Sequence, residues 1–169
     1  MTGKTERALV VGVMGGADVT DEVARKAYEL GALIARRGWI LLNGGRNAGV
    51  MAASAKGAAE SGGITIGILP DADSLQAARH IQIAICTDMG SARNTINVLS
   101  SDVVIACPGG PGTLSEIALA LKHGKTVITM DVDTKGLFAD FLRNGKLIEL
   151  DSPEQVIARI GQIHAGQKS

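Results

Sequence analysis

Short apolar runs of strand length alternate with helical patterns along the chain, and this alternation limits its fold more than any other feature. The runs cover 8–13, 39–42, 64–69, 81–85, 103–106, 126–130 and 147–150. Strands this apolar are typical of a parallel sheet that helices bury on both faces. The sequence therefore predicts an α/β fold: a Rossmann-like, doubly wound, mostly parallel sheet of about six or seven strands.

Helical patterns fill most of the intervals between these runs. Helices are expected over 21–37, 49–61, 91–100 and 154–163, and after the glycine-rich stretch that follows 103–106. Residues 71–80 are polar and irregular, which indicates a loop. The sequence shows no linker or internal repeat, so a single domain over 1–169 is predicted, with flexible ends at 1–7 and 165–169.

Glycine clusters stand directly after several of the predicted strands. Gly15 and Gly16 follow the first strand, Gly44 and Gly45 follow the second, and a longer glycine-rich stretch follows the fifth. In doubly wound sheets, ligands bind beyond the carboxyl ends of the strands, near the point where the strand order reverses. The glycine clusters are therefore predicted to converge on one ligand-binding cleft.

The stretch at 108–116, Pro-Gly-Gly-Pro-Gly-Thr-Leu-Ser-Glu, is the most specific of these clusters. Its glycines allow a tight turn and a close approach to a ligand, because they have no Cβ. The first amides of the helix that follows have no internal partners and carry the positive end of its dipole. We expect an anion, such as a ligand phosphate, against the amides of Gly110 to Thr113.

A purely structural interpretation of the same stretch stays open. Thr113 and Glu116 have the T-x-x-E spacing of a capping box, in which each side chain satisfies the other residue's amide at a helix start. Glu116 is then a cap and has no chemical role. Capping alone does not require three glycines upstream, so the loop is a more specific signal than its acid.

Composition excludes several classes of function. Seventeen basic residues balance seventeen acidic ones, which argues against a surface for nucleic acid. Aromatic residues make up only 2%, so stacking platforms for single strands are not expected. No apolar stretch reaches the ~20 residues of a membrane span, and the first residues lack a signal region. A cytoplasmic protein without membrane contact is expected.

Cysteine and histidine provide no visible metal site. Cys86 and Cys107 each end a strand-like run and lack C-x-x-C spacing, which is typical of small buried apolar groups. Cys107 adjoins the glycine-rich stretch, so a ligand-binding role for it stays open. The three histidines are isolated, and no metal bound by protein ligands is expected.

A dinucleotide site is not predicted, although glycines follow the first strand. The spacing at 12–16 is G-x-x-G-G rather than G-x-G-x-x-G, and no acid stands at the end of the second strand to hold a ribose. A P-loop is absent too, because the Gly-Lys-Thr at 124–126 precedes a strand. NAD is therefore not an expected cofactor.

Two ordered motifs resemble one known superfamily. The stretch 108–116 is similar to the P-G-G-x-G-T-x-x-E signature of the "lysine decarboxylase-like" or Lonely Guy superfamily. A second block, from Gly44-Gly45-Arg46-Asn47 to Gly67-Ile68-Leu69-Pro70, agrees with it. The resemblance spans about residues 9–150 and implies a Rossmann-like fold. Its members include cytokinin-activating phosphoribohydrolases and molybdenum cofactor carrier proteins, and the resembled families are oligomeric.

Two departures favour the carrier branch. The phosphoribohydrolases carry an Arg-Lys pair before the P-G-G strand, whereas this chain has Arg93-Asn94. Their first block has a third glycine, whereas this chain has Arg46. The resemblance thus implies a carrier that binds and protects the molybdenum cofactor, a phosphorylated pterin, as cargo. Its phosphate is expected to contact donors from one loop, namely Gly109, Gly110, Gly112 and Thr113. Arg46 or Arg93 is expected to neutralise the charge of the phosphate.

The hydrolase branch is the alternative. It implies cleavage of the N-glycosidic bond of a nucleoside 5′-monophosphate in the same cleft, with Arg93 and Glu116 serving catalysis. No lysine is singled out for a pyridoxal-phosphate Schiff base, so that cofactor is not expected. Either branch implies a homo-oligomer, a dimer or tetramer, for which the small-residue run 52–55 and the apolar run 117–121 are candidate contact surfaces. Molybdoenzymes are possible partners of a carrier.

Overall fold

The computed structural model describes residues 7–166, and its centre is a seven-stranded sheet in the order β4-β3-β2-β1-β5-β6-β7. Every neighbouring pair is parallel. This confirms the predicted doubly wound, Rossmann-like α/β fold. The strands are β1 (Val10–Met14), β2 (Ile40–Asn43), β3 (Thr65–Leu69), β4 (Ile83–Cys86), β5 (Val103–Ala106), β6 (Thr126–Met130) and β7 (Leu147–Leu150).

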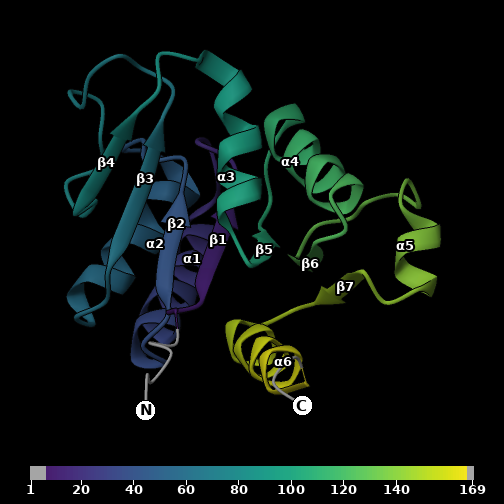
Figure 1. Ribbon diagram of the computed structural model, residues 1–169. Coiled ribbons are helices and arrows are strands. Elements are labelled where there is room, and N and C mark those ends of the chain that lie inside the picture. Colours follow the sequence, from purple (N-terminus) through teal and green to yellow (C-terminus); the bar gives the residue numbers. More distant parts are fainter. Residues whose placement is uncertain (1–6, 167–169) are drawn as a thin grey trace, which may run out of the picture.

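Helices cover both faces of the sheet (Figure 1). One face packs against three helices, α1 (Asp21–Arg36), α2 (Gly49–Glu60) and α6 (Pro153–Gly166). The other face packs against α3 (Asn94–Ser100) and α4 (Pro111–Lys122), with the short α5 (Ala139–Arg143) beside them. A 3-10 turn, η1 (Gly90–Arg93), leads into α3. The sequence pattern did not predict α5, because five residues are too few for a helical period to show.

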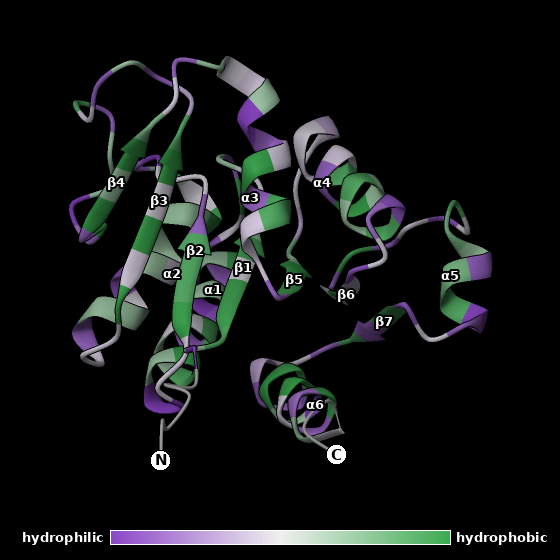
Figure 2. Cartoon of the chain, in the orientation of Figure 1, coloured by the Kyte–Doolittle hydropathy of each residue, from purple (hydrophilic) through white to green (hydrophobic). Residues whose placement is uncertain are grey.

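The strands divide their side chains between two apolar clusters. In β1, Val11 and Val13 belong to the cluster under α1, α2 and α6, whereas Val10 and Met14 belong to the cluster under α3 and α4. This division follows from the period of two in a strand. The strands are mainly apolar throughout, as Figure 2 shows, because both faces of the sheet are covered.

The strand order reverses between β1 and β5. The chain runs outward from β1 to β4 and then returns to place β5 on the other side of β1. Loops at the carboxyl ends of β1 and β5 therefore leave toward opposite faces and open a crevice between them. The predicted glycine clusters lie at this end of the sheet.

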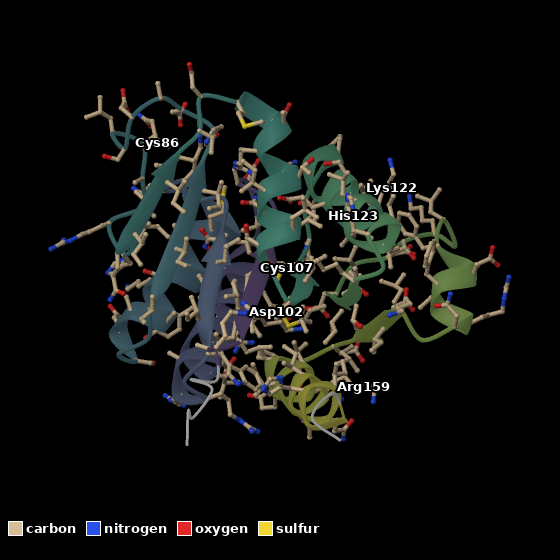
Figure 3. The ribbon with its side chains drawn as sticks, viewed as in Figure 1. Cys86, Asp102, Cys107, Lys122, His123 and Arg159 are labelled. Carbon is tan, nitrogen blue, oxygen red and sulfur yellow. The ribbon has the colours of Figure 1, made fainter. Side chains whose placement is uncertain are left out.

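Strand β4 departs from the prediction that all strands are buried. Ile83 and Ile85 are 47% and 44% exposed, and Cys86 is exposed as well. The reason is that β4 is an edge strand and the segment from Pro70 to β4 forms no helix to cover it. Cys107 is fully buried, so the interpretation of the two cysteines as buried groups is right for Cys107 and wrong for Cys86 (Figure 3).

The ends of the described chain are more ordered than predicted. Arg7 forms an ion pair with Asp102, and α6 continues through residues 165 and 166. The other residues predicted to be flexible, 1–6 and 167–169, lie outside the described part. Side chains satisfy amides at the start of α6, since Ser152 Oγ accepts from the Gln155 amide at 3.4 Å and Gln155 Oε1 accepts from the Asp151 amide at 3.1 Å. Within residues 7–166, no helix has the length and apolar character needed to cross a membrane.

Candidate ligand-binding pocket

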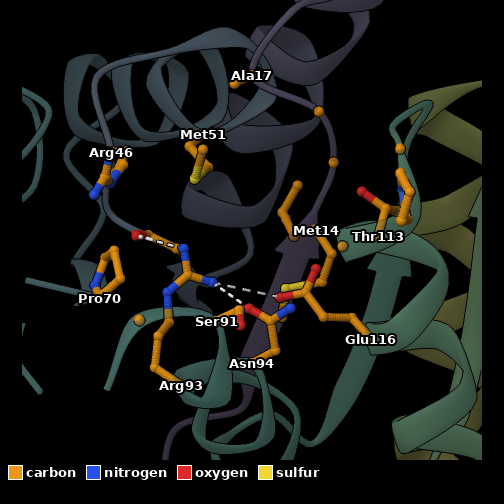
Figure 4. Close-up of a pocket in the computed structure, with 18 residues that line it drawn as sticks. Met14, Ala17, Arg46, Met51, Pro70, Ser91, Arg93, Asn94, Thr113 and Glu116 are labelled. Carbon is orange, nitrogen blue, oxygen red and sulfur yellow. Dashed lines mark hydrogen bonds and ion pairs between the residues drawn. The ribbon is translucent and has the colours of Figure 1, made fainter. Parts of the chain in front are cut away.

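A pocket of about 460 Å³ lies at the carboxyl ends of the central strands, where the order reverses (Figure 4). Segments far apart in the sequence meet there, as the glycine clusters predicted. Most of the predicted site residues line it: Gly15, Gly16, Gly44, Arg46, Arg93, Asn94, Gly110, Gly112, Thr113 and Glu116. Its volume is within the range of ligand pockets, about 300–1,000 Å³.

Gly45 and Gly109 do not line the pocket but allow its walls to approach one another. A Cβ on Gly109 would lie 2.7 Å from the amide nitrogen of Gly16 and 2.2 Å from Thr113 Oγ1. Gly45 has a φ of +77°, and a Cβ there would lie 3.1 Å from Gly67 Cα. Both positions therefore require glycine for close packing of the loops rather than for direct contact with a ligand.

The loop after β5 presents unpaired amides to the pocket. Gly110 is the N-cap of α4, and no side chain in the described part of the chain caps this helix end. The Leu114 amide donates to the Gly110 carbonyl at 3.2 Å, so the preceding amides of Gly112 and Thr113 have no partner within the helix. Free amides next to the positive end of a helix dipole are the geometry expected of an anion site.

The predicted capping box of Thr113 and Glu116 is wrong. Helix α4 begins at Pro111, two positions before Thr113, because proline fixes φ at a value suited to the first helical position. Glu116 lies inside the helix and does not reach back to the Thr113 amide. Its Oε1 instead accepts a hydrogen bond from Asn97 Nδ2 at 2.9 Å, in the interior of the protein.

Arg93 connects three segments around the pocket (Figure 4). Its Nη1 donates to Asn94 Oδ1 at 2.6 Å and lies 3.8 Å from Glu116 Oε1. Its Nη2 donates to the carbonyl of Gly44 at 3.4 Å. Burial lowers the pKa of Arg93, and the nearby Glu116 carboxylate opposes this shift. The guanidinium is thus held in the pocket wall, with only 12% of its side chain exposed.

Glu116 is the acidic partner of this arginine, and its side chain is only 7% exposed. Burial raises the pKa of Glu116, while the hydrogen bond from Asn97 and the charge of Arg93 act in the opposite direction. Asn97 is completely buried on α3 and was not predicted as a site residue. The signal that could have found it is a polar residue on the apolar face of a short helix, one turn after Asn94.

Asn94 links the arginine to the first turn of α4. Its Oδ1 accepts from Arg93, and its Nδ2 donates to Ser115 Oγ at 3.2 Å. Ser115 Oγ in turn donates to the Gly112 carbonyl at 2.6 Å. An amide fits this position because it is a donor and an acceptor at once, which a lysine is not.

Arg46 approaches the pocket from the segment after β2. Its Nη2 donates to Asp71 Oδ1 at 2.7 Å, and its side chain is 44% exposed. Asp71 follows β3 and was not predicted to support the site. The second arginine of the pocket is therefore held at the rim, whereas Arg93 is held in the wall.

Cys107 takes no part in the pocket, although it precedes the glycine loop. Its side chain belongs to the apolar cluster under α1, α2 and α6, and burial raises the pKa of its thiol to about 12. The ligand-binding role that the sequence left open is therefore not supported. Within residues 7–166, no group of three or more His, Cys, Asp or Glu side chains could hold a metal ion.

The parallel sheet and the pocket at its switch point define a Rossmann-like α/β protein with a cleft of small-molecule size. The chain belongs to the SLOG cluster4 family, whose model matches residues 8–157. This confirms the superfamily that the two sequence motifs indicated.

Two solved structures are similar over nearly their whole length. A molybdenum cofactor binding protein from Rippkaea orientalis is 50% identical, with a TM-score of 0.88 over 93% of this chain and 98% of that chain. A molybdenum cofactor carrier protein from Chlamydomonas reinhardtii is 42% identical, with a TM-score of 0.87 over 94% of this chain and 99% of that chain.

A more distant relative represents the other branch. A cytokinin riboside 5′-monophosphate phosphoribohydrolase from Mycobacterium tuberculosis is 35% identical over 127 residues, which are 65% of this chain and 63% of that protein. The chain is thus a carrier-like member of its superfamily, with the hydrolases at lower identity and lower coverage.

Proposed function

We propose that this protein is a carrier that binds the molybdenum cofactor as cargo and protects it. The observation that supports this most is the likeness, at 42–50% identity over nearly the whole chain, to structures of molybdenum cofactor binding and carrier proteins. The residues of the pocket are compatible with such a ligand, which combines a terminal phosphate with a flat pterin ring.

The phosphate fits the loop at the start of α4. The free amides of Gly112 and Thr113 and the helix dipole favour an anion there. Arg93 and Arg46 line the same pocket, and a guanidinium matches phosphate oxygens with two parallel hydrogen bonds. The walls also include Met14 and Met51, whose thioethers adapt their shape to flat apolar ligands. The pocket therefore offers both polar donors and apolar side chains to a ligand.

Survival of the cofactor tests this function directly. Molybdenum cofactor is released from a molybdoenzyme in anaerobic buffer, and the active fraction is followed by activation of a cofactor-free molybdoenzyme. We expect the fraction to persist longer with the wild-type protein than with an equal concentration of the Arg93→Ala variant. Equal decay with both proteins and with buffer alone would reject the carrier function.

The second candidate is a phosphoribohydrolase for nucleoside 5′-monophosphates. It is favoured by the relative at 35% identity and by the placement of Arg93 and Glu116 together in the pocket, 3.8 Å apart. In this case Glu116 activates the attacking water, and Arg93 stabilises developing charge. Incubation with AMP and related monophosphates should release negligible free base if the carrier function is right. Robust release that disappears in Glu116→Gln would establish the hydrolase instead.

We also propose that the protein acts as a cytoplasmic homo-oligomer, a dimer or tetramer, that delivers cargo to molybdoenzymes. Several of the expected contact residues are unsuited to this role because they are buried within the chain itself, among them Ala55, Ile117 and Leu121. Exposed apolar residues remain elsewhere, among them Ile83 and Ile85 on the edge strand. Sedimentation at micromolar concentration tests the assembly, and a monomer alone would reject it.

A further inference from the structure

A carrier has no need of a general base, yet this pocket contains a buried carboxylate. Glu116 is 6% exposed, and Arg93 from η1 is the charged side chain whose field acts on it among the described residues. Arg46 and Asp71, from the segments after β2 and β3, act on Arg93 from the far side. The other close polar partner, Asn97 on α3, has no charge. Burial favours the neutral form of Glu116, and Arg93 is the charged group that opposes it, beside the hydrogen bond from Asn97.

We propose that Glu116 takes up a proton when an anionic ligand engages Arg93, so that the pocket binds its ligand together with a proton. This inference rests on the proposed function, since it requires a phosphate-bearing ligand in the pocket. It extends that function, because it makes affinity depend on pH and gives the carrier a means of release.

The geometry around Arg93 supports competition between ligand and carboxylate. The contact of Arg93 with Glu116 is 3.8 Å, longer than the 2.7–2.9 Å of a close guanidinium–carboxylate hydrogen bond. A phosphate dianion therefore draws the guanidinium more strongly than Glu116 does. The bound ligand also excludes water and adds negative charge, and both effects favour the neutral form of a nearby carboxyl group.

Asn97 offers a partner for both protonation states of Glu116. Its Nδ2 donates to the carboxylate at 2.9 Å, and its Oδ1 is buried without a hydrogen-bond partner among residues 7–166. Rotation of the amide by half a turn exchanges donor and acceptor. The Oδ1 atom then accepts from the protonated Glu116 hydroxyl. The free acceptor, which would otherwise be an unexplained buried polar atom, is the group that the protonated state requires.

Calorimetry with 6-hydroxymethylpterin monophosphate as the probe tests the proposal. Titrations in two buffers of different ionisation enthalpy give the number of protons taken up on binding, from about pH 5 to about pH 8. The phosphate of the probe titrates near pH 6, so the wild-type protein is compared with Glu116→Gln, which cannot take up the proton. The difference between the two isolates Glu116.

We expect the wild-type protein to take up more protons than Glu116→Gln, with an excess that approaches one proton. The affinity of the wild type should then fall relative to that of the variant as pH rises, by up to about tenfold per pH unit. Infrared difference spectra should show a protonated carboxyl band on binding in the wild type alone. In Asn97→Leu, the unligated carboxylate loses its donor and the protonated Glu116 of the complex loses its acceptor, so the pH range of the excess uptake should narrow.

The possible failures are distinct. If the probe binds and both proteins take up the same number of protons at every pH, the proposal is wrong and the carrier function stands. If the probe binds at no pH and the cofactor-survival assay is also negative, the carrier function fails and the proposal fails with it. Loss of folding in Asn97→Leu leaves the comparison with Glu116→Gln decisive.

Discussion

Gly31 of α1 and Gly57 of α2 each lie directly against the backbone of the other helix. A Cβ on Gly31 would lie 2.0 Å from the carbonyl oxygen of Ser54, and a Cβ on Gly57 would lie 1.9 Å from that of Tyr28. These neighbours are backbone atoms that cannot rotate away. The two glycines therefore fix how closely α1 and α2 approach, and α2 in turn supports the loop that carries Arg46.

Substitution at this contact should destabilise the protein. We expect Gly31→Ala to lower the free energy of unfolding by about 1–3 kcal/mol, because the helices must separate. Gly161→Ala on α6 is the matched control, since the nearest atom to its Cβ would be 3.8 Å away. That variant should be neutral or more stable by about 0.5–1 kcal/mol, from the helix preference of alanine. Urea unfolding measures both, and equal effects would contradict the close contact.

The buried arginine should dominate ligand binding. We expect Arg93→Ala to weaken binding of a phosphorylated pterin by about 1.5–3 kcal/mol, as loss of a charge-assisted hydrogen bond does. Calorimetry measures this loss.

Arg25→Ala is the control, because Arg25 is exposed on α1 and pairs with Glu29 one turn away. An equal loss of affinity in both variants would point to a general electrostatic effect rather than to a site at Arg93.

The two cysteines should differ in reactivity. Cys107 is fully buried and burial raises the pKa of its thiol to about 12, so thiolate is scarce at neutral pH. Cys86 is exposed on the edge strand. Iodoacetamide at pH 7.5 should therefore modify Cys86 in the native protein and both cysteines in denaturant, as mass spectrometry can show. Rapid modification of Cys107 in the native protein would contradict its burial.

The stability of the free protein should depend on the ionisation of Glu116. Burial raises the pKa of Glu116 above its ordinary value of 4.5, so the folded state holds this proton more tightly than the unfolded state. The stabilisation is complete below pH 4.5 and is lost as pH rises through the folded pKa. Relative to Glu116→Gln, the wild type should therefore lose stability across this window. Parallel stability curves for the two proteins would show that Glu116 is not buried as described.

Features that follow from local pattern were predictable from the sequence. The strands with continuous apolar runs appeared within two residues of their predicted bounds, and the glycines after β1, β2 and β5 met at one pocket. The exposure of β4 was not predictable from its composition, since Ile83 and Ile85 have the apolar side chains that are typical of core residues. They are uncovered because β4 is an edge strand and the segment after Pro70 forms no helix.

The polar contacts inside the pocket were not predictable, because they join residues by fold rather than by spacing. Thr113 and Glu116 have a spacing that predicts a local cap, yet Pro111 starts the helix earlier and frees Glu116 to meet Asn97. Asp71 forms an ion pair with Arg46, and the two residues come from irregular segments whose contacts no periodic pattern predicts. The interpretation that Glu116 only caps the helix, and so has no role in binding, is therefore no longer supported.

Because β1 pairs with β5, the pocket can form only late in the synthesis of the chain. Val11 is in register with Val103, and Gly15 and Glu116, from the ends of this pair, line one pocket. Contacts so distant in sequence form late and close a long loop, which slows folding relative to local contacts. A growing chain on the ribosome therefore has no pocket until α4 has emerged. Loading with cargo can only follow the emergence of α4, so a product truncated before this helix cannot sequester a scarce cofactor.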